Sequence, residues 1–241
     1  MIDRFHQLLQ FSQSYIGDLS PETFAIILVL VLLEAILSAD NAIALASLVR
    51  NLGNPDQEKL ALRFGLIGAF VLRVLLILVA TWVIRYWQFQ LAGAVYLLWL
   101  AGKFFWEKSK KGADDTSPTV IANKLWQVVL LIAFTDLAFS LDSVTAAVAV
   151  AEETWLVLLG GLMGILALRF LANLFVKWIE EYTYLESAGY VIVLIVGAKL
   201  LLKVVNAELL PPEWAVLSVI GGIFAWGFSK RNPEVSSAEQ S

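Results

Sequence analysis

The sequence predicts an all-α membrane protein: seven transmembrane helices, arranged as an inverted repeat of two three-helix halves plus one extra C-terminal helix. The chain of 241 residues is 59% hydrophobic and has a mean hydropathy of +0.77, well above the apolar share of a soluble domain. Two apolar segments about a hundred residues apart also carry the same pattern of charged residues. The first observation predicts the class and the second predicts the arrangement.

Seven runs are long and apolar enough to cross a hydrocarbon core about 30 Å thick. They lie near residues 23–49, 61–84, 88–106, 125–150, 155–179, 187–205 and 213–228. The preceding segment, residues 1–22, lacks a basic region followed by an apolar one, so we expect no cleaved signal peptide. The first span is therefore expected to be retained and to anchor the chain in the membrane.

Polar segments divide the spans into units. We expect repeat 1 at residues 23–107, a cytosolic linker at 108–123, repeat 2 at 124–206, the seventh helix at 207–229 and a disordered tail at 230–241. Outside the spans, nine Lys and Arg residues lie on the side of the linker and the C-terminus, against three on the other side. This bias predicts an N-terminus outside and a C-terminus in the cytosol.

The repeat is clearest in its polar positions. EAILSADNAIALA and TDLAFSLDSVTAA match at an offset of 102, which pairs Glu34, Ser38, Asp40 and Asn41 with Asp136, Ser140, Asp142 and Ser143. From Gly65 onward the offset is 96, with 14 identities in 39 positions. Each copy has three spans, so the second copy enters the membrane with opposite polarity. Inverted repeats are typical of transporters that bind their cargo near the midplane.

Six charged residues are expected near the centres of their spans. Intramembrane charges normally face the bundle interior and pair with each other or with a substrate. Four acids and two arginines sum to −2, which one divalent cation would balance. The six are Glu34, Asp40, Asp136, Asp142, Arg73 and Arg169.

Helical geometry separates the roles of the acids. Asp40 lies six residues after Glu34, about 120° away around a straight helix, so one helix cannot aim both at one point. We assign Asp40 and Asp142 to the cation. Asn41 and Ser143 would add neutral oxygen ligands to this site.

The roles of the other charged residues stay open. Glu34 and Asp136 would either ligate the cation as well or hold Arg73 and Arg169, which act in charge balance or gating. Lys199 is expected to reach toward the lipid headgroups.

The composition limits the chemistry. The chain has no cysteine and one histidine, His6, outside the spans, so an intramembrane metal site must use oxygen ligands. Oxygen ligands favour Mg²⁺, Ca²⁺ or Mn²⁺. Because crowded carboxylates bind protons more readily, cation/proton exchange is expected. The sequence has no nucleophile with a positioned histidine and no P-loop, so we expect neither an enzyme nor a resident cofactor, and no nucleic-acid partner.

The paired stretches EAILSADNAIALASLV and TDLAFSLDSVTAAVAV resemble the TerC family, within the LysE-like inverted-repeat transporters, over nearly the whole chain. The resemblance implies a seven-helix exporter of Mn²⁺ in the plasma or thylakoid membrane. It also implies that Asp40, Asn41 and Asp142 bind the metal, with Glu34 and Asp136 beside them.

Two other functions stay open. One is a membrane-assembly factor, whose function would lie in the loops and the tail rather than in the acids. The other is a Ca²⁺/H⁺ exchanger of the same architecture. Ion preference, stoichiometry, transport direction and oligomeric state are left undetermined by the sequence.

Overall fold

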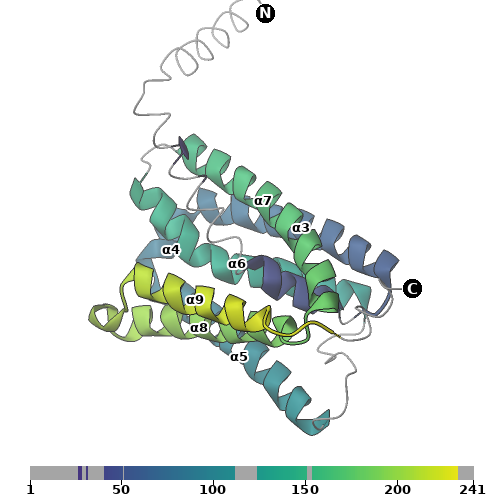
Figure 1. The fold of residues 1–241 in the computed structure, drawn as a ribbon. Helices are drawn as coiled ribbons and strands as arrows, with labels where there is room; N and C mark the ends of the chain where they lie inside the picture. Colours follow the sequence, from purple (N-terminus) through teal and green to yellow (C-terminus); the bar gives the residue numbers. More distant parts are fainter. Residues whose placement is uncertain are drawn as a thin grey trace, which may run out of the picture.

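The computed structural model describes residues 27, 28, 31, 41–50, 52–111, 124–150 and 154–232. Residues 41–50 are helical. The elements that follow are α3 (Pro55–Leu78), α4 (Ala80–Arg85), α5 (Trp87–Lys111), α6 (Leu125–Val150), α7 (Thr154–Glu181), α8 (Leu185–Val205), the short 3-10 helix η1 (Ala207–Leu209) and α9 (Glu213–Gly227). Figure 1 labels the α-helices from α3 to α9. Within these residues there is no strand, only an isolated bridge between Tyr182 and Arg231. The all-α prediction is confirmed.

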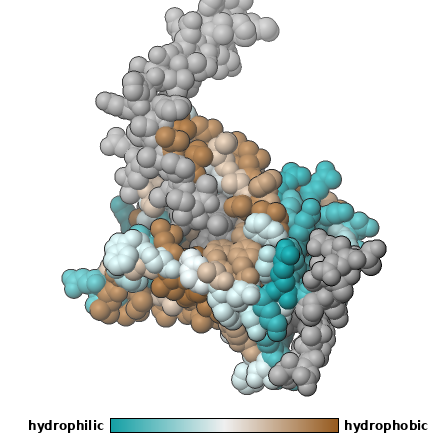
Figure 2. All heavy atoms as spheres, viewed as in Figure 1, coloured by the Kyte–Doolittle hydropathy of each residue, from teal (hydrophilic) through white to brown (hydrophobic). Residues whose placement is uncertain are grey.

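Five of the helices, α3, α5, α6, α7 and α8, are long and apolar enough to cross a membrane. Two shorter apolar helices accompany them, Asn41–Arg50 and α9. Large apolar side chains cover much of the surface, including Trp99, Phe170 and Trp214, and Figure 2 shows this apolar surface with hydrophilic residues gathered toward its edges. A soluble protein of this size would rarely expose such a surface, whereas lipid covers it without cost.

The second span differs from its predicted bounds. Helix α3 begins at Pro55, six residues before the predicted 61, because Asn54 caps it by accepting hydrogen bonds from the backbone amides of Asp56 and Gln57. Proline suits the first helical position, where its missing N–H costs nothing. At its other end α3 stops at Leu78, and the last predicted residues form the separate short helix α4.

Helix α6 lies between α3 and α5 and packs against both through glycines. A Cβ atom added at Gly65 of α3 would lie 2.6 Å from Cγ2 of Ile132, and one added at Gly93 of α5 would lie 2.7 Å from Cδ1 of Leu141. Neither position has room for a side chain, as expected for close helix packing in membranes.

The neighbours of helix α8 include the 41–50 helix, α5 and α9. Gly189 of α8 faces Ile43 and Ser47 of the 41–50 helix, and Gly197 faces Leu97 of α5. Helix α9 lies along α8 (Figure 1). Aromatic contacts also join α9 to α7, such as that between Phe175 and Phe224, whose ring centroids are 5.6 Å apart.

Candidate functional site

The centre of the described bundle holds a buried ion pair between α3 and α6. Nη2 of Arg73 donates a hydrogen bond to Oδ1 of Asp136 at 3.0 Å, and the two side chains are 2% and 0% exposed. The hydroxyl of Ser140, one turn along α6, donates to the other carboxylate oxygen at 3.3 Å. Both carboxylate oxygens therefore have a partner, and Asp136 holds Arg73, which is one of the two roles left open by the sequence.

Asp142 is held differently, by two lysines of α8. Nζ of Lys203 donates to Oδ1 at 2.6 Å and Nζ of Lys199 donates to Oδ2 at 2.9 Å. Lys199 also contacts Glu213, the first residue of α9, at 3.0 Å. The side chains of Asp142 and Lys203 are 22% and 28% exposed, so this cluster is more open than the arginine pair.

The two acids of α6 face different neighbours because of their spacing. Asp136 and Asp142 are the twelfth and eighteenth residues of a 26-residue helix. Six residues correspond to about 9 Å along the axis and about 120° around it. Asp136 thus lies near the middle of α6, whereas Asp142 lies nearer its carboxyl end. We expected both acids near the centre of the span.

The neutral candidate ligands are both buried. Asn41 is 5% exposed and begins the described 41–50 helix. Ser143 is 4% exposed, and its hydroxyl donates to the carbonyl of Ser140 at 3.5 Å. A hydroxyl that donates to a carbonyl still has oxygen lone pairs available for a cation.

Arg169 lies at a groove between α3 and α7. Its side chain is exposed and lines a cavity of about 360 Å³ together with Arg63 and six apolar residues. Glu34 and Asp40, the acids predicted for the first span, lie outside the described residues.

Within the residues that the structure describes, no group of three or more His, Cys, Asp or Glu side chains is placed to hold a metal ion. The predicted four-acid site includes Glu34 and Asp40, so its assembly stays a prediction. The described half of that site has one acid held by arginine and one held by lysines.

Sequence reasoning missed Lys203 and Glu213 and gave Lys199 a different environment. Lys199 was expected to extend toward the headgroups, but it turns inward to Asp142. One signal was available: Lys199 and Lys203 are four residues apart, which places both ammonium groups on one face of a helix.

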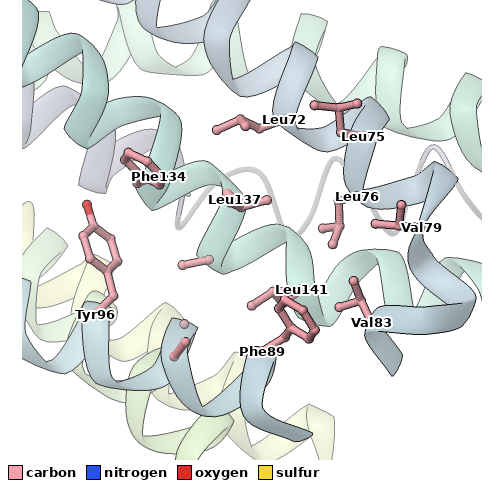
Figure 3. Close-up of a pocket in the computed structure, with 13 residues that line it drawn as sticks. Leu72, Leu75, Leu76, Val79, Val83, Phe89, Tyr96, Phe134, Leu137 and Leu141 are labelled. Atoms are coloured by element: carbon pink, nitrogen blue, oxygen red, sulfur yellow. The ribbon is translucent and has the colours of Figure 1, made fainter. Parts of the chain in front are cut away.

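A second cavity of about 390 Å³, between α3, α4, α5 and α6, has an apolar lining (Figure 3). Leucines and phenylalanines line most of it. Tyr96 contributes a polar group to this lining, but its hydroxyl already forms a hydrogen bond with the hydroxyl of Thr135 at 2.9 Å and donates to the carbonyl of Leu131. A hydrated ion would lose its water without replacement there, so this cavity is not an ion site.

Comparison with known proteins identifies the family. A family model described as the integral membrane protein TerC family matches residues 19–234. The chain belongs to the TerC family. It is therefore an integral, multi-pass membrane protein, in agreement with its apolar helices.

The relatives found include membrane proteins of bacteria. The uncharacterized membrane protein YceF of Bacillus subtilis is 38% identical over 75% of this chain and 72% of its own length. The uncharacterized membrane protein YkoY of the same species is 34% identical over 89% and 76%. The putative membrane-bound redox modulator Alx of Salmonella typhi is 26% identical over 71% of this chain and 62% of its own length. No solved structure matches the chain significantly.

Proposed function

We propose that this TerC-family protein is a secondary transporter that exports a divalent cation, Mn²⁺ first among the candidates, in exchange for protons. The observation that carries the proposal is the difference between the two acids of α6. Asp136 is locked in a fully buried pair with Arg73, whereas Asp142 is partly exposed and held by flexible lysines. An acid that binds and releases a cargo must be reachable, and Asp142 meets this requirement.

The inverted repeat is part of the proposal, and two contacts support it. Gly93 of the first half packs on α6 of the second half, and its counterpart Gly189 packs on the 41–50 helix of the first half. A two-fold relation between inverted halves requires this exchange of partners. The two-fold relation also predicts an ion pair between Arg169 and Glu34, as the counterpart of the Arg73–Asp136 pair. We propose that the complete bundle has seven helices.

With both arginines paired in this way, Asp40 and Asp142 become the cation ligands of the two halves. Asn41 and Ser143, each the next residue in the chain, would add neutral oxygens. Carboxylate, amide and hydroxyl oxygens suit a hard cation such as Mn²⁺, Ca²⁺ or Mg²⁺. The acids would take up protons after the cation leaves, which would couple export to a proton gradient. We place the N-terminus outside and the C-terminus in the cytosol, in a plasma or thylakoid membrane.

Mn²⁺ flux in proteoliposomes of known orientation tests the proposal. Asp142→Asn keeps the shape of the side chain but removes its charge. We expect Mn²⁺ flux to fall at least about tenfold, because loss of even an outer-shell partner of a metal site typically costs about 10–100-fold. Glu208→Gln, an exposed acid in η1, is the control and should keep wild-type flux. Wild-type flux in Asp142→Asn would contradict the transport mechanism. Competition by Ca²⁺ or Mg²⁺ distinguishes a Mn²⁺ exporter from a Ca²⁺/H⁺ exchanger.

The name of the Alx relatives favours a second candidate, a membrane-bound modulator of redox state or assembly. The chain has no cysteine, so thiol chemistry of its own is excluded. This candidate places function in the loops and tail, so deletion of 109–117 or 232–241 should then impair function more than Asp40→Ala. The reverse order of effects would favour transport.

A further inference from the structure

We propose that Lys199 and Lys203 are internal counter-cations of Asp142: they occupy its carboxylate when no metal is bound, and the arriving divalent cation displaces them. This inference rests on the proposed transport function and deepens it. It assigns a role in metal exchange to Lys199 and Lys203, which the transport proposal itself does not specify.

The contacts set lysine binding and metal binding in competition. Each ammonium group occupies a different oxygen of Asp142, Lys203 at 2.6 Å and Lys199 at 2.9 Å. A hard cation binds carboxylate oxygens at about 2.0–2.6 Å, so it would lie close to both ammonium groups and be repelled by them. The metal therefore competes directly with both lysines for Asp142.

The lysines can leave without stranding a buried charge. Lys199 is mostly buried but already contacts the exposed carboxylate of Glu213, so it keeps a partner after it releases Asp142. Lys203 is near the carboxyl end of α8 and partly exposed, so its ammonium can extend toward water. The Arg73–Asp136 pair has no such freedom, because its two side chains are almost fully buried and breaking it would leave an uncompensated charge.

This exchange would favour divalent cations. Two monovalent ammonium groups leave Asp142 and one divalent cation arrives, so the charge next to the carboxylate is unchanged. A monovalent cation would bring only half of the charge of the two ammonium groups that it displaces, so it would compete less well for Asp142. The lysine pair would thereby discriminate against Na⁺ and K⁺ by charge rather than by size.

The repeat makes this arrangement one-sided. Lys103 is the counterpart of Lys199 in the first half, but the counterpart of Lys203 is Glu107, which lies 3.9 Å from Lys103. The first half thus carries one lysine and one acid where the second half carries two lysines. We expect the two ends of the transport path to hold the cation with different strength.

Mn²⁺ binding and flux of the full chain test the inference. The variant Lys199→Met/Lys203→Met keeps the length of both side chains and removes the competing charges. If the form in which both lysines bind Asp142 exceeds nine-tenths of the wild-type population, the half-saturating Mn²⁺ concentration of this variant should be at least about tenfold lower than that of the wild type. Lys203→Arg, with a bidentate guanidinium, should raise it. Lys110→Met, an exposed lysine of α5, is the control for loss of a charge; Lys103 is unsuitable because it is the counterpart of Lys199.

The outcomes separate this inference from the proposed function. Thermal unfolding and size-exclusion profiles first establish that the double variant is folded. If the wild type transports Mn²⁺ and the folded double variant has the same half-saturating concentration, the lysine role is overturned and transport stands. If neither protein binds or transports Mn²⁺, the proposed function fails, and this inference fails with it. If the double variant misfolds, Lys203→Met alone replaces it. A half-saturating Mn²⁺ concentration equal to that of the wild type would again overturn the lysine role.

Discussion

Replacing Arg73 with leucine should destabilise the protein strongly, because it leaves the carboxylate of Asp136 buried and uncompensated. The two side chains are almost completely buried, so water cannot reach the carboxylate to compensate for the lost guanidinium charge. Breaking a buried ion pair by removing one partner costs about 3–5 kcal/mol. For a chain of this size, each kcal/mol lowers the melting temperature by about 2–4 °C, so the expected decrease is roughly 6–20 °C.

Thermal unfolding of purified protein in detergent measures this decrease. Arg63→Leu, which removes an exposed arginine from the same helix, is the matched control and should change stability by less than about 0.5 kcal/mol. The double variant Arg73→Leu/Asp136→Leu should recover much of the lost stability, since no charge remains buried. Equal melting temperatures for Arg73→Leu and Arg63→Leu would refute the assignment of Asp136 to Arg73.

Three further substitutions test the packing and capping of the helices by the same thermal assay. Gly65→Ala should cost about 1–3 kcal/mol because its Cβ would clash with the branched carbon of Ile132, whereas Gly102→Ala has free space and should be neutral or stabilising; equal effects would contradict the close contact. Asn54→Ala should cost about 1 kcal/mol by removing the cap of α3, and Asn54→Asp should keep stability; a neutral alanine would show that the cap contributes nothing. Tyr96→Phe should cost about 1 kcal/mol through its lost hydrogen bonds, and an unchanged melting temperature would show that these bonds contribute nothing to stability.

Apolar periodicity and length were sufficient to predict an all-helical membrane protein. They were poorer at the ends of helices, since the polar first turns of α3 carry the residues PDQEK, which a hydropathy criterion excludes from a span. The helix begins there because of Asn54 and Pro55, a local capping effect that hydropathy does not measure. The hydropathy pattern also gave no indication of the break at Val79 between α3 and α4, because the apolar run continues through it.

The candidate site was predictable in part. Helical spacing predicted that acids six residues apart would face different directions, as Asp136 and Asp142 do. It left open which neighbours they would meet, because that depends on how α3 and α8 pack around α6. The contact of Glu213 could not be predicted for the same reason: Glu213 is distant in sequence from Asp142, and Lys199 bridges the two acids.

The interface between α3 and α6 combines a glycine contact without spare volume and a charge pair without access to water. Such an interface cannot slide or separate by small steps, because either movement would open a void or expose an unpaired charge. We therefore expect the contact between α3 and α6 to stay intact during a conformational change. The bonds from Lys199 and Lys203 of α8 to Asp142 can instead break one at a time, so we expect movement to occur there.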